Sequence, residues 1–150
     1  MLSSALLLLH IVTMFTVAVL HSGPQVLTLA AARAGQPAAV VGIAGMYART
    51  GRAVPPLGIL GLLFGLGTAL TGGFNLLAPW LLIAYALFAL LVVYGGVKSH
   101  PYVVGLGEAV RDGRPNQEEL LGRRLTLIVA VDVAIYLAII ADMVLKPFSS

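Results

Sequence analysis

The chain of 150 residues contains no cysteine, which excludes disulfides, thiolate metal sites and cysteine nucleophiles. Charge is also scarce: only 10% of the residues are Asp, Glu, Lys or Arg, against about 25% in a soluble domain. The common catalytic motifs are missing too, namely HExxH, GxSxG, the Walker loop and a GxGxxG that opens a βαβ unit. The basic residues form no aromatic-rich face, so nucleic-acid binding is not expected. These absences leave no sign of a soluble catalytic domain.

Apolar residues make up 59% of the chain and gather in four long runs. A helix of about 20 residues crosses the hydrocarbon core of a bilayer, which is about 30 Å thick. We therefore expect a single all-α domain, an integral membrane four-helix bundle whose surroundings are lipid. The predicted spans cover about 2–22, 57–74, 76–97 and 125–145. The first run lacks a basic leader and a small-x-small cleavage site, so we expect it to be a retained span and not a signal peptide.

Two longer links, at about 23–56 and 98–124, separate these spans. In the first link, a helix kinked at Pro24 is predicted to continue to Arg33, because proline removes a backbone donor. After a break, residues 38–49 are expected to form a mildly amphipathic helix on the membrane surface.

The second link is predicted to hold a short helix around 102–112 between turns. The last helix is then expected to begin at an Asn116 N-cap, followed by Glu118 and Glu119 in its first turn. We predict that His100 is a surface residue of this link.

The distribution of basic residues predicts the topology. The two links hold eight of the nine Lys and Arg side chains, namely Arg33, Arg49, Arg52, Lys98, Arg111, Arg114, Arg123 and Arg124. The positive-inside rule places such links in the cytoplasm, so both termini are expected outside.

Small residues recur on one face of the second span. Gly61 and Gly65 form a GxxxG pair, and Gly72 extends their row at helical spacing. Small residues let helix backbones approach closely in lipid. We expect this face to be tightly packed within the bundle, or between copies in a homo-oligomer or a larger membrane complex.

Ionisable residues inside the apolar runs are costly and usually have partners. His10 and His21 are eleven residues apart, which places them within about 20° on one face of the first span. His10 could donate a hydrogen bond to a nearby acceptor, ligate haem or copper, or handle a proton. His21 could do the same or lie at the membrane interface.

Asp132 is the acid placed deepest in a predicted span, at a depth between the two histidines. It could pair with one of them across the first and last helices. It could instead make a structural hydrogen bond with Tyr85, Tyr94 or Thr68. Asp142 precedes Lys146 by four residues, which predicts a local ion pair on the last helix.

Two segments resemble a known bacterial family of small predicted integral membrane proteins of unknown function. They are LLLLHIVTMFTVAVLHSG (6–23) and DMVLKPF (142–148), and the length and four-span layout are also similar. That family is distantly similar to copper-resistance D proteins and to small haem-dependent protoporphyrinogen oxidases. The resemblance implies a bacterial plasma membrane protein, and it implies that His10 would be the position that serves haem or copper.

Three functions follow as hypotheses. The first is an accessory, assembly or structural membrane subunit without catalysis of its own. The second is a haem- or copper-binding protein, with a redox role open to it, that uses His10. The third is a small proton or solute carrier that uses Asp132 and a histidine.

Overall fold

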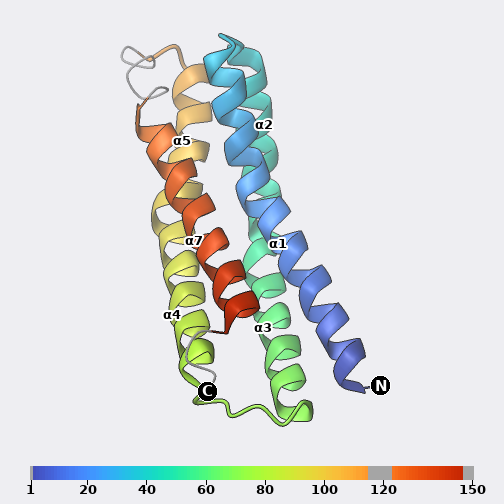
Figure 1. The fold of residues 1–150 in the computed structure, drawn as a ribbon. Coiled ribbons are helices and arrows are strands. Elements are labelled where there is room, and N and C mark those ends of the chain that lie inside the picture. The colour runs from blue at the N-terminus through green and yellow to red at the C-terminus, as the bar shows by residue number, and fades with distance from the viewer. Residues whose placement is uncertain (1, 115–122, 147–150) are drawn as a thin grey trace.

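The computed structural model describes residues 2–114 and 123–146, and every regular element in those ranges is helical. The elements are α1 (Leu2–Arg33), α2 (Pro37–Thr50), the 3-10 turn η1 (Gly51–Ala53), α3 (Val54–Thr71), α4 (Pro79–Tyr94), the π-helical turn η2 (Gly95–Ser99), α5 (His100–Arg111) and α7 (Leu125–Leu145). Because η1 joins α2 to α3 and η2 joins α4 to α5, these six elements make two long helices. With α1 and α7, the described residues contain four helices that are long and apolar enough to cross a membrane (Figure 1). For the described residues, the expectation of an all-helical fold with four helices long and apolar enough to span a membrane is confirmed.

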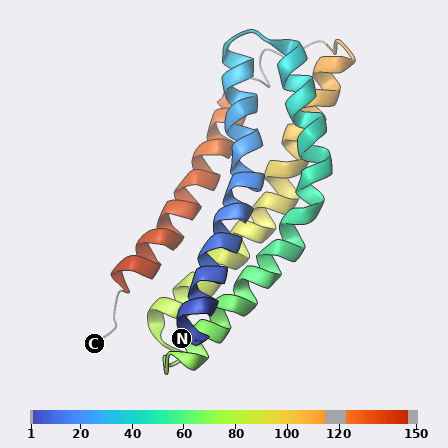
Figure 2. The ribbon, with the colours of Figure 1, turned by 90° about the vertical axis from the view of Figure 1, so that its right-hand side faces the viewer.

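The four long helices lie side by side and alternate in direction (Figure 1). The beginning of α1 and the end of α7 lie at the end of the bundle that also carries the α3–α4 connection (Figure 1). Helix α1 packs against α3, α2 and α7, while α2 packs against α5 and α4 packs against α7. Figure 2 shows that the end of α7 diverges from the beginning of α1. Because α1 also contacts α5, both α1 and the long helix that contains α4 and α5 touch each of the other three long helices.

Three of the long helices exceed the thickness of a bilayer core. They contain 32, 35 and 33 residues, or roughly 50 Å each at 1.5 Å per residue. The excess over about 30 Å lies toward the end of the bundle that carries Arg33, Arg49 and Arg111, which we name the arginine-rich end. The apolar remainder of each helix has the length that a hydrocarbon layer requires.

The described parts of the two predicted links, 23–56 and 98–114, are largely helical and packed into the bundle. The expected helix at 38–49 exists as α2, but its predicted position on a membrane surface is wrong, because the chain continues through η1 into α3 without leaving the helical conformation. Pro55 and Pro56 lie in the first turn of α3, where the missing N–H groups cost little. The turn expected before 102–112 is likewise replaced by η2 and α5. The predicted start of the last helix at Asn116 lies outside the described residues.

The buried apolar core is concentrated at the arginine-rich end. One cluster joins α1, α2, α5 and α7 through Ala31, Val40, Ala44, Tyr47, Val103, Leu106 and Leu125. A smaller cluster of Ala69, Trp80 and Leu81 lies near the α3–α4 connection. Between them, many large apolar side chains face outward, including Leu8 and Phe15 of α1. An outer surface of this kind is suited to lipid and not to water.

Glycines set the approach of α1 to α3. A Cβ atom built on Gly61 would lie 2.5 Å from the sulfur of Met14, and one on Gly65 would lie 2.8 Å from the His10 ring. These two glycines therefore receive α1 side chains of the same chain, and their face is used inside the bundle. Gly72 differs: it caps α3, and a Cβ there would meet Phe74 and the Thr68 carbonyl, so it does not extend the packing face as predicted.

The predicted ion pair between Asp142 and Lys146 is wrong. Lys146 ends α7 in the left-handed conformation, with φ 42° and ψ 60°, which carries its side chain away from the face of Asp142. Its ammonium nitrogen instead lies 4.8 Å from the ring centre of Phe74 and 5.4 Å from that of Trp80. Neither carboxylate oxygen of Asp142 has a hydrogen-bond partner among the described residues.

We predict that Gly65→Leu lowers the free energy of unfolding by about 1–3 kcal/mol, because the new side chain must displace the His10 ring. The matched control is Gly42→Leu, since a Cβ on Gly42 meets no atom within 4 Å. Thermal unfolding in mild detergent measures both. Equal unfolding temperatures for the two variants would contradict the packing of α1 on α3.

Candidate functional site

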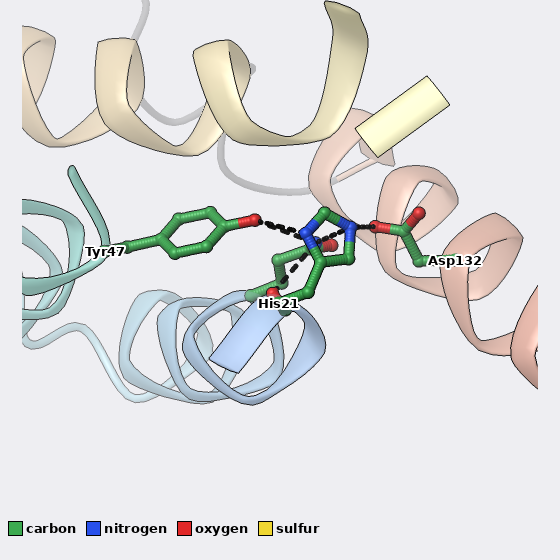
Figure 3. Close-up of polar contacts among 4 residues, drawn as sticks. His21, Tyr47 and Asp132 are labelled. Carbon is green, nitrogen blue, oxygen red and sulfur yellow. Dashed lines mark hydrogen bonds and ion pairs between the residues drawn. The ribbon is translucent and has the colours of Figure 1, made fainter. Parts of the chain in front are cut away.

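A cluster of buried polar side chains lies where α1, α2 and α7 meet (Figure 3). Helix α1 supplies His21 and Gln25, α2 supplies Tyr47 and α7 supplies Asp132. Gln25, Tyr47 and Asp132 are fully buried, and His21 is 6% exposed. Buried polar groups of this kind are costly in a membrane protein, so their contacts indicate the site. We name these four residues the polar cluster.

Local structure explains how His21 enters the cluster. Gln25 stands one helical turn after His21, so the two side chains share a face of α1. Gly95, between α4 and α5, lies against the His21 ring. A Cβ atom built on Gly95 would lie 2.7 Å from Cε1 and 2.9 Å from Nε2 of His21. Gly95 opens the π-helical turn η2, and such turns occur often at functional sites. A residue without a side chain at this turn gives the imidazole its space.

Both ring nitrogens of His21 have polar neighbours. Nδ1 lies 2.9 Å from the Tyr47 hydroxyl, which is a hydrogen-bond distance. Nε2 lies 3.4 Å from Oδ2 of Asp132 and 3.2 Å from the amide nitrogen of Gln25. The imidazole therefore bridges α2 and α7 through its two sides (Figure 3).

The Gln25 amide allows two hydrogen-bond patterns. It donates one N–H to the backbone carbonyl of His21 at 3.1 Å, which fixes its nitrogen toward the ring. Its other N–H can reach either His21 Nε2 or the Tyr47 hydroxyl oxygen, at 3.2 and 3.4 Å. The choice between these acceptors depends on which nitrogen of His21 carries a proton.

When Nε2 of His21 is unprotonated, it accepts from Gln25, and the Nδ1–H donates to the Tyr47 oxygen. When Nε2 is protonated, its proton faces Asp132, and Gln25 donates to Tyr47 instead. The Tyr47 hydroxyl can then donate to an unprotonated Nδ1. Both patterns fit the same heavy-atom positions, so a proton can occupy either side of the ring.

The surroundings of Asp132 make its charge depend on His21. Among the described residues, neither carboxylate oxygen of Asp132 accepts a hydrogen bond, although Oδ2 is within ion-pair distance of His21. A buried carboxylate without donors is unstable unless a cation lies beside it or it binds a proton. Within the described part of the chain, His21 is the basic side chain at that distance from Asp132.

A partly open cavity of about 340 Å³ adjoins the polar cluster. His21, Tyr47 and His100 form part of its wall, and apolar residues of α3 and α4 form much of the rest. The Tyr47 and His100 rings meet edge to face, with centroids 4.8 Å apart. His100 is thus half-buried against Tyr47, and the prediction of a surface residue is wrong.

The structure separates the two histidines of α1. His10 lies nearer the beginning of α1 than the polar cluster does. Its Nδ1 is 2.7 Å from the Gly61 carbonyl oxygen and donates to it. His21, on the same face of α1, meets α2 and α7 instead of α3. Of the predicted site residues, the structure brings together His21 and Asp132 and leaves His10 outside.

Sequence reasoning missed two members of the cluster. Tyr47 was not expected in the site because its helix was predicted to lie on the membrane surface. Gln25 was not expected there because it follows Pro24, where the first link was predicted to begin. The spacing of His21 and Gln25 was the available signal, since residues four apart share a helix face. The hydroxyls proposed as alternative partners of Asp132, on Tyr85, Tyr94 and Thr68, do not bond to it; that of Thr68 donates to its own helix at the Phe64 carbonyl.

The structure places His10, the expected haem or copper ligand, apart from the cavity. Its Nδ1–H is used by Gly61, which leaves Nε2 as the nitrogen for a metal, but the cavity does not reach His10. Across residues 2–114 and 123–146, no group of three or more His, Cys, Asp or Glu side chains could hold a metal ion. His10 makes a structural hydrogen bond, and its role toward haem or copper stays a prediction.

Comparison with protein-family models, with curated proteins and with solved structures gives no match for this chain. The resemblance to small bacterial membrane proteins stays a prediction.

We predict that His21→Leu lowers the free energy of unfolding by about 3–5 kcal/mol, because it leaves the Asp132 carboxylate buried and unpaired. The double variant His21→Leu/Asp132→Leu is expected to be more stable than His21→Leu, since it removes both buried polar groups. Detergent or denaturant unfolding of the four proteins of this cycle measures the coupling. Strictly additive effects of the two single substitutions would show that the side chains do not interact.

Proposed function

We propose that this protein is a small multi-pass membrane protein that takes up and passes on a proton at the His21–Asp132 pair. The observation that carries the proposal is the position of this pair. A histidine and an aspartate lie 3.4 Å apart inside a bundle of apolar helices, and the aspartate is fully buried. Paired ionisable groups inside membrane spans are typical of proton pathways.

The chemistry of the pair supports exchange of a single proton. Histidine changes its charge near neutral pH, and here its two nitrogens have alternative partners on opposite sides. Nδ1 of His21 can take up a proton from the Tyr47 side while the Nε2 proton moves to Asp132. Gln25 adapts to either state by changing its acceptor, without movement of a helix.

The position of the pair also supports a pathway. Tyr47 and His100 connect the pair to the cavity, and Arg52 lies at the cavity wall. We infer from the positive-inside rule that the arginine-rich end faces the cytoplasm of a bacterial cell, with both termini on the other side of the plasma membrane. The proton would then enter or leave the pair from the cytoplasmic side.

The glycine face that suggested an accessory or homo-oligomeric subunit lends less support to that role, since Gly61 and Gly65 already receive α1. Four spans are few for a carrier, so we infer that the working unit is a homo-oligomer or part of a larger membrane complex that uses another surface.

Proton flux into liposomes tests the proposal. We predict that the reconstituted protein dissipates an imposed pH gradient, and that Asp132→Asn and His21→Gln reduce the flux to that of empty liposomes. Both substitutions keep the approximate shape of the side chain but remove its ability to exchange the proton. An internal pH-sensitive dye measures the rate.

Two matched variants are the controls. His10→Gln changes the other histidine of α1, and Asp142→Asn changes the other aspartate of α7, and neither residue belongs to the polar cluster. Both are expected to retain the flux of the unaltered protein. Absence of flux from well-folded unaltered protein would contradict the proposal and leave the accessory role.

A further inference from the structure

The cavity beside the polar cluster is larger than a proton pathway requires. Its volume of about 340 Å³ falls in the range of about 300–1,000 Å³ that is usual for small-molecule sites. We propose that this cavity binds a small amphipathic anion, a molecule with one acidic head and an apolar body, which enters from the lipid layer. This inference does not depend on proton exchange at His21.

Two basic residues in the cavity wall suit an acidic head. They are Arg52 and His100, and Nε2 of His100 is buried and has no hydrogen-bond partner among the described residues. No acidic side chain lines the cavity in the described part of the chain. The wall therefore offers a carboxylate a fixed positive charge and an unpaired imidazole nitrogen.

Much of the remaining wall suits an apolar body. Val17, Ile59, Phe88, Leu91 and Val92, from three helices, supply side chains without polar atoms, while His21 and Tyr136 also line the cavity. Gly58 and Gly96 also line it, and their lack of side chains leaves part of the space empty. A mostly apolar pocket with a few convergent polar groups is the usual form of a site for a small amphipathic molecule.

The packing of the helices provides a route from lipid. Although α3 and α4 are consecutive along the chain, they are not among the closely packed helix pairs of the described residues. The cavity lies between them, since Gly58 and Ile59 come from α3 and Phe88 and Leu91 come from α4. An amphipathic molecule could therefore reach the cavity sideways, with its head at the level of Arg52 and its chain in the apolar layer.

Equilibrium binding of radiolabelled decanoate to the full chain in nanodiscs tests this proposal. We expect saturable binding of one decanoate per chain, in excess of uptake by empty nanodiscs. Gly96→Leu should weaken binding by at least about tenfold because the side chain fills the cavity, and Arg52→Gln should weaken it several-fold because the head loses its charge. Decyltrimethylammonium, which has a cationic head, should not compete.

Each variant has a matched control on the same long helix. Gly105→Leu adds the same side chain where a Cβ atom meets nothing within 4 Å and where the cavity does not reach. Arg49→Gln removes an exposed arginine that bonds to the Gly45 carbonyl instead of lining the cavity. Both controls should bind decanoate within about twofold of the unaltered protein.

Three results would overturn the proposal: binding that does not saturate, equal loss in the control variants, or effective competition by decyltrimethylammonium. Because neither His21 nor Asp132 is altered, failure of this test is distinct from failure of proton exchange. Circular dichroism of each variant identifies any that do not fold, and the Arg52 pair still decides the question if Gly96→Leu is lost.

Discussion

The contact between His21 and Asp132 constrains much of the bundle around it. A carboxylate that accepts no hydrogen bond must have a cation or a proton beside it, and here the imidazole of α1 supplies either. To hold that imidazole, η2 presents Gly95 and α2 brings Tyr47 to the other ring nitrogen, while the continuation of α1 past Pro24 places Gln25 beside it. The contacts of α1, α2, η2 and α7 at this level therefore all bear on one pair of side chains.

The bundle divides into two zones along its axis. Toward the arginine-rich end, α1, α2, α5 and α7 share a well-buried core. Toward the α3–α4 connection, the helices carry outward-facing apolar side chains and meet through the contact of α1 with Gly61 and Gly65 and through the smaller cluster around Trp80. The polar cluster and the cavity lie where these zones join. That position gives ionisable groups access both to the charged end of the protein and to the lipid layer.

The sequence predicted the helices better than it predicted their connections. Runs of apolar residues identify spans because a fixed length of helix must cross a fixed thickness of lipid. The same rule does not tell whether Arg52 or Lys98 ends a helix or lies within one, and here the backbone continues through both. As a result, α2 was expected on a surface and Tyr47 was left out of the site.

The candidate site was predicted only in part. A pairing of Asp132 with a histidine followed from depth alone, but depth favoured neither His10 nor His21. The choice depends on which helix faces each level of α1, and that is a property of three-dimensional packing. The Asp142–Lys146 pair failed for a different reason, because the left-handed conformation at Lys146 ends the regular spacing on which the prediction relied.

Nitrogen-15 NMR of the His21 ring, in unaltered protein and in Asp132→Asn, tests the central claim most directly. If Asp132 holds the Nε2 proton, the unaltered protein should show a protonated Nε2 over part of the pH range. In Asp132→Asn that nitrogen should instead appear as an unprotonated acceptor, bonded to Gln25. Identical ring-nitrogen shifts in the two proteins at every pH would contradict a shared proton between His21 and Asp132.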